Sequence, residues 1–177
     1  MWSSHVKTGA ELTISSIPAT ALAKEFGTPA FIMDEADFRE RASAWNTALA
    51  NAFGSNTGTV YYAAKAFICV EVARWIKDLG IGIDVCTGGE LAVALKGGIN
   101  PAKIEVHGNN KSVAEIEKAV SVGVGTIVID SLYEIERVAA AATKHGVVQK
   151  VLLRLTPGIE AHTHESIATA HEDVKFG

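Results

Sequence analysis

Residues 60–85 read VYYAAKAFICVEVARWIKDLGIGIDV: an apolar run, a segment with helical period, and a second apolar run. The two runs are rich in β-branched and aromatic residues, which is typical of strands. Between them Val72, Trp75 and Ile76 fall on one face of a helix. Three more strand-like runs continue the pattern, with starts 21 to 23 residues apart, at 104–106, 126–129 and 149–153. Strands joined by helical crossovers predict a parallel sheet with helices outside it.

The even spacing also favours one arrangement of that sheet. An open doubly wound sheet and a closed barrel both contain such units, but regular units without a longer crossover favour eight-fold closure. A sixth strand is expected near 173–177. We therefore predict an α/β fold, a TIM (β/α)8 barrel of which the sequence holds about the first five units. The open edges of so incomplete a barrel predict that the isolated chain aggregates or associates.

Local signals mark where the helices begin and end. A hydroxyl residue followed three positions later by a glutamate is typical of a capping box, in which each side chain accepts from the other residue's backbone N–H. Such boxes are expected at Thr87/Glu90, Ser112/Glu115 and Ser131/Glu134. A glycine at a helix end supplies the left-handed residue that turns the chain back. The glycines in that position are Gly80, Gly97, Gly123 and Gly146.

A separate segment precedes the repeat. Residues 28–33 (TPAFIM) predict one more strand, and Asp34 is expected to cap the helix that follows. We therefore predict two parts: an N-terminal segment, 1–33, with a strand outside the barrel, and the incomplete barrel, 34–177.

Composition argues against several classes of protein. Sixteen Lys and Arg against 20 Asp and Glu, without a basic stripe, disfavour nucleic-acid binding. No apolar run approaches the roughly 20 residues that span a bilayer, and the first residues do not resemble an export leader. Cys69 and Cys86 show neither disulfide nor zinc spacing. A cytoplasmic protein with reduced thiols and no metal is expected.

Each of the five predicted strands ends in an ionisable residue, and such ends converge on the catalytic face of a barrel. These residues are Lys65, Asp84, His107, Asp130 and Arg154. A lysine desolvated in a barrel mouth is the nucleophile for a Schiff base with an aldehyde. Asp84 and His107 could hold or relay protons beside it, and Arg154 supplies a positive charge for a phosphate or carboxylate. Asp130 has capping of the next helix as its alternative, and His107 has packing.

Three weaker features remain. Gly88 and Gly89 open a helix after a strand, where N–H groups can bind phosphate, although a tight turn is the plainer interpretation. The His- and Glu-bearing segments at 162–166 and 171–173 favour a polar substrate loop over a metal site. Glu105 shares its face of the strand with His107, which is unusual for an acid within a sheet.

The segment Tyr62–Phe67 (YAAKAF) resembles the pyridoxal-phosphate attachment signature of the ornithine/diaminopimelate/arginine decarboxylase family, which has an alanine-racemase-like barrel. Further motifs in the right order narrow the resemblance to its diaminopimelate decarboxylases. They are 26–29 (FGTP), 83–85 (IDV), 88–91 (GGEL), 107–112 (HGNNKS), 154–158 (RLTPG) and 162–165 (HTHE).

The resemblance implies a pyridoxal 5'-phosphate-dependent carboxy-lyase that converts meso-2,6-diaminopimelate into L-lysine and carbon dioxide, the last step of lysine biosynthesis. It implies that Lys65 holds the cofactor and that Asp84, His107 and Arg154 contact it, with Glu90 as a supporting acid. The strand at 28–33 would belong to the C-terminal β domain of the full enzyme, a homodimer, and an isolated fragment would be inactive. The alternatives are another decarboxylase or a racemase of this fold, or a non-catalytic cofactor-binding barrel.

Overall fold

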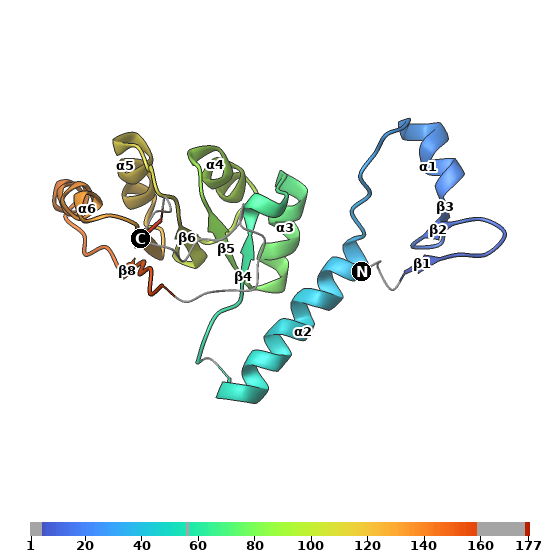
Figure 1. Cartoon of the computed structure of the whole chain (residues 1–177), viewed down its shortest axis with the longest axis horizontal. Helices are drawn as coiled ribbons and strands as arrows, with labels where there is room; N and C mark the ends of the chain where they lie inside the picture. Colours follow the sequence, from blue (N-terminus) through green and yellow to red (C-terminus); the bar gives the residue numbers. More distant parts are fainter. Residues whose placement is uncertain (1–4, 56, 159–175) are drawn as a thin grey trace. The chain divides into compact units, whose positions relative to one another are not determined.

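The computed structural model describes residues 5–55, 57–158 and 176–177, in which the chain forms two units, 1–60 and 61–177. In the second unit five strands pair in chain order as a parallel sheet, which confirms the predicted α/β class (Figure 1). They are β4 (Tyr61–Ala63), β5 (Gly82–Val85), β6 (Ile104–Val106), β7 (Thr126–Ile129) and β8 (Val151–Leu153). The connecting helices are η1 (Ala64–Ala66), α3 (Val70–Leu79), α4 (Gly88–Lys96), η2 (Pro101–Lys103), α5 (Val113–Val122) and α6 (Leu132–His145).

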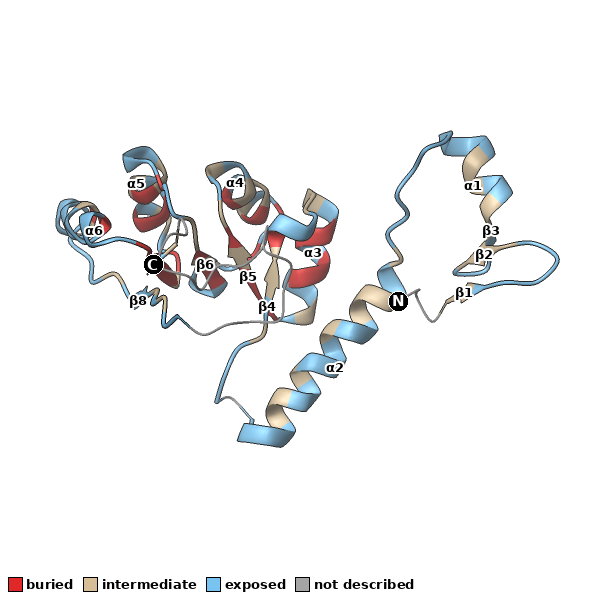
Figure 2. Ribbon diagram, in the orientation of Figure 1, coloured by how far each residue is buried: buried red, intermediate tan, exposed pale blue. Residues whose placement is uncertain are grey.

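The core of this unit lies between the sheet and the inner faces of its helices (Figure 2). Its largest fully buried side chains are Ile76, Ile83, Ile104, Ile116, Ile127, Val72 and Val85. All four residues of β7 are buried, as in the strands of parallel sheets that are covered on both faces. All three residues of β8 are exposed, since it forms an edge of the sheet. The apolar period read from the sequence therefore identifies the core-facing helix positions.

Three of the four predicted helix-terminating glycines adopt the left-handed conformation: Gly80, Gly123 and Gly146. The prediction for Gly97 is wrong, because its φ of −70° is right-handed and the next residue, Gly98, has φ +83°. Gly97 is required for a different reason. A Cβ at that position would collide with the Cβ of Ala73 on α3, so the glycine permits close packing of α4 against α3.

One of the three predicted capping boxes closes completely, that of Ser112 and Glu115 on α5. Thr87 accepts from the N–H of Glu90, but the Glu90 carboxylate accepts from Cys86 N, at 2.5 Å, rather than from the cap. Ser131 makes no capping bond, and the Glu134 carboxylate accepts from Asp130 N at 2.8 Å. These two glutamates reach past the cap residue to the exit of the preceding strand.

The first unit contains a small antiparallel sheet and two helices. Its strands, β1 (Val6–Lys7), β2 (Thr13–Ile14) and β3 (Ile17–Pro18), pair in chain order and were not predicted. Helices α1 (Ala19–Phe26) and α2 (Glu35–Phe53) follow. Asp34 caps α2 as predicted, because its carboxylate accepts from the N–H groups of Ala36 and Asp37.

Two expectations about strands have other outcomes. Residues 28–33 form no strand, because this segment pairs with none of the residues that the structure describes, and an apolar run does not reveal where its ladder partner lies. The sixth strand expected at 173–177 falls mainly outside the described residues. Among the described helices, none combines the length and apolar character needed to cross a bilayer.

Candidate active site

Because β4 to β8 are parallel, the ionisable residues at their carboxyl-terminal ends lie along one edge of the sheet, the edge formed by these strand ends. Lys65 lies on the turn η1 after β4, and Asp84 lies within β5. His107, Asp130 and Arg154 directly follow β6, β7 and β8. The ladder continues into these exits, since His107 N donates to Val85 O at 2.8 Å and Arg154 N donates to Ile129 O at 2.9 Å. The backbones carrying both side chains are therefore fixed.

His107 meets two carboxylates. Its Nε2 lies 2.7 Å from Glu105 Oε1 and 3.7 Å from Asp84 Oδ1. The unusual placement of Glu105 on the same face as His107 thus has an explanation, because the acid orients the imidazole. The Glu105 hydrogen bond also argues against the alternative in which His107 is only a packing residue.

Asp84 is the acid of this group whose protonation the surroundings change most clearly. Burial raises the pKa of its carboxyl, and nearby Glu105 and Glu90 add to the rise, while His107 and Lys65 oppose it. Its Oδ1 is buried without a hydrogen-bond partner among the described residues. Burial also raises the pKa of the neighbouring Cys86 thiol, so this cysteine is protonated at neutral pH and is a poor nucleophile.

Asp130 and Arg154 form a second pair at the same edge. Arg154 Nη1 lies 3.5 Å from Asp130 Oδ1, and the Asp130 side chain is 5% exposed. The guanidinium of Arg154 also lies over the ring of Phe176, 3.8 Å from its centroid. The capping alternative for Asp130 is wrong, because Ser131 occupies the N-cap position of α6.

Lys65 lies in a turn that a hydrogen bond closes, and the residue is exposed to solvent. The Tyr62 hydroxyl donates to Phe67 O at 2.6 Å, which closes the segment that carries the lysine. The expected desolvation is not found: Lys65 is exposed, because η1 extends beyond the end of an edge strand. Its amine makes no hydrogen bond or ion pair within the described part of the chain.

The Gly88 turn is not open to a phosphate. The N–H of Gly88 donates to Glu115 Oε1 at 2.8 Å, so a carboxylate of α5 takes the place that an anion would need. The segments at 162–166 and 171–173 lie outside the described residues. In the described ranges, no group of three His, Cys, Asp or Glu side chains comes together as metal ligands.

Sequence reasoning did not find the contacts of Lys111. This lysine is buried and meets the equally buried Glu134, with Nζ 3.0 Å from Oε2. The signals in the sequence are the 107–112 motif (HGNNKS), which contains this lysine, and an acid in the first turn of α6.

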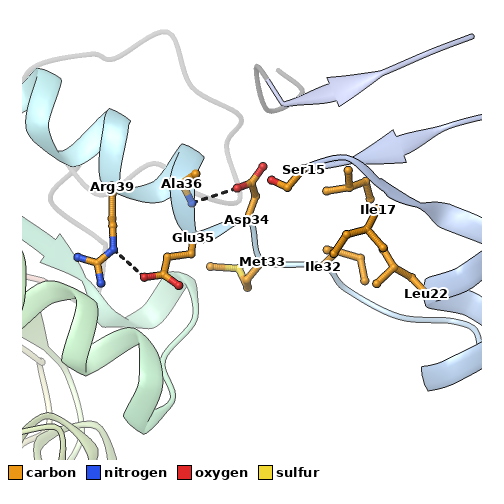
Figure 3. A pocket seen from close by; sticks show the side chains of 10 residues that line it. Ser15, Ile17, Leu22, Ile32, Met33, Asp34, Glu35, Ala36 and Arg39 are labelled. Carbon is orange, nitrogen blue, oxygen red and sulfur yellow. Dashed lines mark hydrogen bonds and ion pairs between the residues drawn. The ribbon is translucent and has the colours of Figure 1, made fainter.

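A pocket of about 450 Å³ lies within the first unit (Figure 3). Ile17, Leu22 and Ile32 line its apolar side, and Arg39 and Glu35, joined by an ion pair, stand at another part of its wall. It contains none of the predicted site residues.

Comparison with known proteins assigns the class. The family model "Pyridoxal-dependent decarboxylase, pyridoxal binding domain" matches residues 35–177. The chain belongs to this family, which confirms the resemblance drawn from the motifs. The matched domain is the pyridoxal-binding one, so the cofactor is pyridoxal phosphate.

The particular relatives are diaminopimelate decarboxylases. That of Mycobacterium tuberculosis is 60% identical over 164 residues, which cover 93% of this chain and 36% of the relative. The solved diaminopimelate decarboxylase of M. jannaschii in co-complex with L-lysine has a TM-score of 0.84 and 28% identity, covering 99% of this chain and 41% of that one. The Helicobacter pylori enzyme complexed with L-lysine gives a TM-score of 0.75 and 29% identity, over 88% of this chain and 39% of that one. The chain spans about a third of the length of the curated relatives, consistent with a partial barrel.

The residues at the sheet edge fit pyridoxal phosphate. The cofactor needs a lysine amine for covalent attachment, and the Lys65 amine is available. It also carries anionic and protonated groups, for which the edge offers the Arg154 cation and two buried carboxylate oxygens without hydrogen-bond partners, on Asp84 and Asp130.

Proposed function

We propose that this chain belongs to an enzyme that removes the carboxylate at the D-centre of meso-2,6-diaminopimelate, giving L-lysine and carbon dioxide. The observation that carries the proposal is the 60% identity to a diaminopimelate decarboxylase over 93% of the chain. The bond between the α-carbon and the carboxylate carbon breaks, and a proton replaces the carboxylate, so no oxidant is required. The reaction would complete lysine biosynthesis.

We assign the residues at the sheet edge as follows. Lys65 holds the cofactor covalently through its Nζ, because the segment clamped by Tyr62 presents an unpaired amine. Asp84, His107 and Arg154 contact the cofactor. When bound, pyridoxal phosphate supplies the ring that accepts the electron pair left by carbon dioxide.

The remaining side chains of the edge keep these groups in place. Glu105 sets the orientation of the His107 ring, and Glu90 holds the backbone of Cys86 directly after β5. The positive charges of His107 and Lys65 both lower the pKa of Asp84, against the rise that burial causes.

We also propose the setting in which the enzyme acts. The free cysteines and the biosynthetic relatives support the cytoplasm, and we place the complete enzyme there as a homodimer. A family match that begins at residue 35 supports the division into a segment 1–33 and an incomplete barrel 34–177.

The test is product formation by the full-length protein with pyridoxal phosphate. We expect carbon dioxide and L-lysine in equal amounts from meso-diaminopimelate, and none from ornithine or arginine. Release of carbon dioxide from those amino acids instead would assign another decarboxylase. Racemisation without carbon dioxide release, or cofactor binding without turnover, would refute the proposed reaction.

A further inference from the structure

The buried ammonium of Lys111 makes two hydrogen bonds and one ion pair. Its Nζ donates to Gly108 O at 2.5 Å and to Val128 O at 2.7 Å, and it lies 3.0 Å from Glu134 Oε2. The side chains of Lys111 and Glu134 are 2% and 4% exposed. Two of its N–H donors are used by backbone carbonyls, and the Glu134 carboxylate pairs with its charge, so the Lys111 ammonium is already engaged on several sides.

These acceptors belong to different parts of the second unit. Gly108 lies in the loop after β6, Val128 lies in β7, and Glu134 lies in the first turn of α6. The same oxygen of Glu134 also accepts from Asp130 N at 2.8 Å. One carboxylate oxygen of Glu134 therefore contacts the ends of two strands. It accepts directly from Asp130 N after β7, and through Lys111 it is linked to Gly108, the residue after His107.

The loop held in this way contains a backbone position that favours glycine. Gly108 has φ +121°, a conformation that other residues rarely adopt, and a Cβ there would lie 3.4 Å from Cys86 O. The loop lies between His107, whose N–H is in the sheet ladder, and Ser112, which caps α5. The Lys111 ammonium ties the middle of this connection to β7.

Stability alone does not account for such a pair. Desolvation of two charges offsets most of their attraction, and apolar pairs of similar volume are often as stable. A buried ammonium differs from an apolar pair in fixing directions, since its two hydrogen bonds and its ion pair each restrain one backbone or side-chain oxygen.

We infer that Lys111 and Glu134 are positioning residues of the site, which hold the exits carrying His107 and Asp130 in the arrangement that receives the cofactor. The inference rests on the proposed function for the identity of that cofactor. Neither residue touches the reacting atoms.

The test is the double variant Lys111→Met/Glu134→Gln in the full-length protein. Both charges are removed together, and Gln keeps an oxygen for the Asp130 N–H, so the variant is expected to fold, at a lower melting temperature because the carbonyls of Gly108 and Val128 lose their donor. Pyridoxal phosphate binding, followed by the absorbance of the bound cofactor, should weaken by roughly tenfold or more, the size expected for about 1.4 kcal/mol of lost preorganisation. In the cofactor-free protein, amide hydrogens of 108–111 should exchange faster.

A matched control is Lys103→Met. The ammonium of Lys103 also donates a hydrogen bond to a backbone oxygen, that of Gly80. This contact is exposed to solvent and lies at the amino-terminal ends of the strands, away from the site. The control variant should change neither cofactor binding nor exchange in 108–111. If the double variant does not fold, Lys111→Gln/Glu134→Gln is the milder variant, because it also removes both charges together while a Gln in place of Lys111 keeps an N–H donor. The same two effects are then expected at smaller size.

The outcomes separate this inference from the proposed function. If the variants bind the cofactor and exchange their amides like the parent, the pair is merely structural and the inference is overturned. If the melting temperature falls while cofactor binding and amide exchange stay as in the parent, the inference is overturned as well. If the parent itself does not bind pyridoxal phosphate at Lys65, the proposed function fails, while the exchange measurement still decides whether the pair fixes the loop.

Discussion

His107 Nε2 lies 2.7 Å from the carboxylate of Glu105, two residues earlier on the same face of β6. An acid within a sheet is costly unless it is bonded, and here its partner is the imidazole that faces Asp84 on the next strand. The contact makes Glu105 the residue that sets the direction of the His107 ring.

Replacing Glu105 with Leu should therefore weaken the binding of pyridoxal phosphate. A hydrogen bond involving a charged group contributes about 1.5–3 kcal/mol, so we expect a loss of roughly tenfold or more in affinity. Titration of the cofactor, followed by its absorbance, measures the change. Glu71→Leu, which removes an exposed acid paired with Arg74 on α3, is the control and should bind as the parent does. Equal affinities in both variants would mean that Glu105 does not orient His107.

Lys65 is expected to carry the cofactor. Borohydride treatment of the loaded protein should fix the cofactor's mass to the peptide that contains Lys65, and Lys65→Ala should abolish both labelling and turnover. Lys65→Arg should not restore them, because a guanidinium stays protonated and cannot form the covalent link. The matched control, Lys96→Ala, removes a lysine of the last turn of α4 and should be labelled normally. Labelling of any other lysine would refute the assignment.

The cofactor-free protein should be more stable at neutral pH when Asp84 is replaced by Asn. The raised pKa means that the folded protein binds this proton more tightly than the unfolded chain. The favourable contribution of Asp84 is thus fully present below its unfolded pKa, about 3.9, and is lost as the pH rises through the folded value. Asp84→Asn should melt higher than the parent at pH 7, and the difference should vanish toward pH 3. A variant that melts lower at pH 7 would contradict this sign.

Glu115 should stabilise the protein at neutral pH and lose that effect in acid. Its carboxylate accepts from the N–H and hydroxyl of Ser112 and from Gly88 N, and these hydrogen bonds lower its pKa. We expect Glu115→Ala to reduce the free energy of unfolding by about 1–2 kcal/mol at pH 7, in the range of lost caps. The difference should shrink as the pH falls through the lowered pKa. Urea denaturation at several pH values measures it.

The comparison variant for Glu115 lies on the same helix. Glu117→Ala removes a half-exposed acid that pairs with Lys144 and His145 at the surface, and surface pairs of this kind contribute little. If Glu117→Ala is as destabilising as Glu115→Ala at pH 7, the link from α5 to Gly88 is not what stabilises the protein.

Sequence patterns predicted the features of this molecule that depend on residues close together in the chain. The spacing of apolar runs predicts five parallel strands, and the residue types at their ends predict which side chains share an edge. The Ser112/Glu115 box closes because both partners lie within one turn. The family motifs around Lys65 predict the cofactor.

The remaining features depend on contacts between distant residues. Glu90 and Glu134 satisfy a strand exit instead of a cap, which depends on where that exit lies in space. Gly97 is small because Ala73 of another helix faces it. The apolar run at 28–33 carries no information about a partner, so its pairing could not be predicted from its own residues.

The glutamates at the starts of α5 and α6 contact residues earlier in the chain, and this has a consequence for the order in which the protein folds. Glu115 binds an N–H 27 residues earlier in the chain, and Glu134 binds the ammonium of Lys111 in the preceding loop. A growing polypeptide therefore acquires each loop restraint one strand-helix unit late, after the next helix has begun. In refolding with pulsed hydrogen exchange, protection at 108–111 should appear together with α6 and not with α5. Each strand–helix unit would then fix the loop of the unit that precedes it, at the carboxyl-terminal ends of the strands.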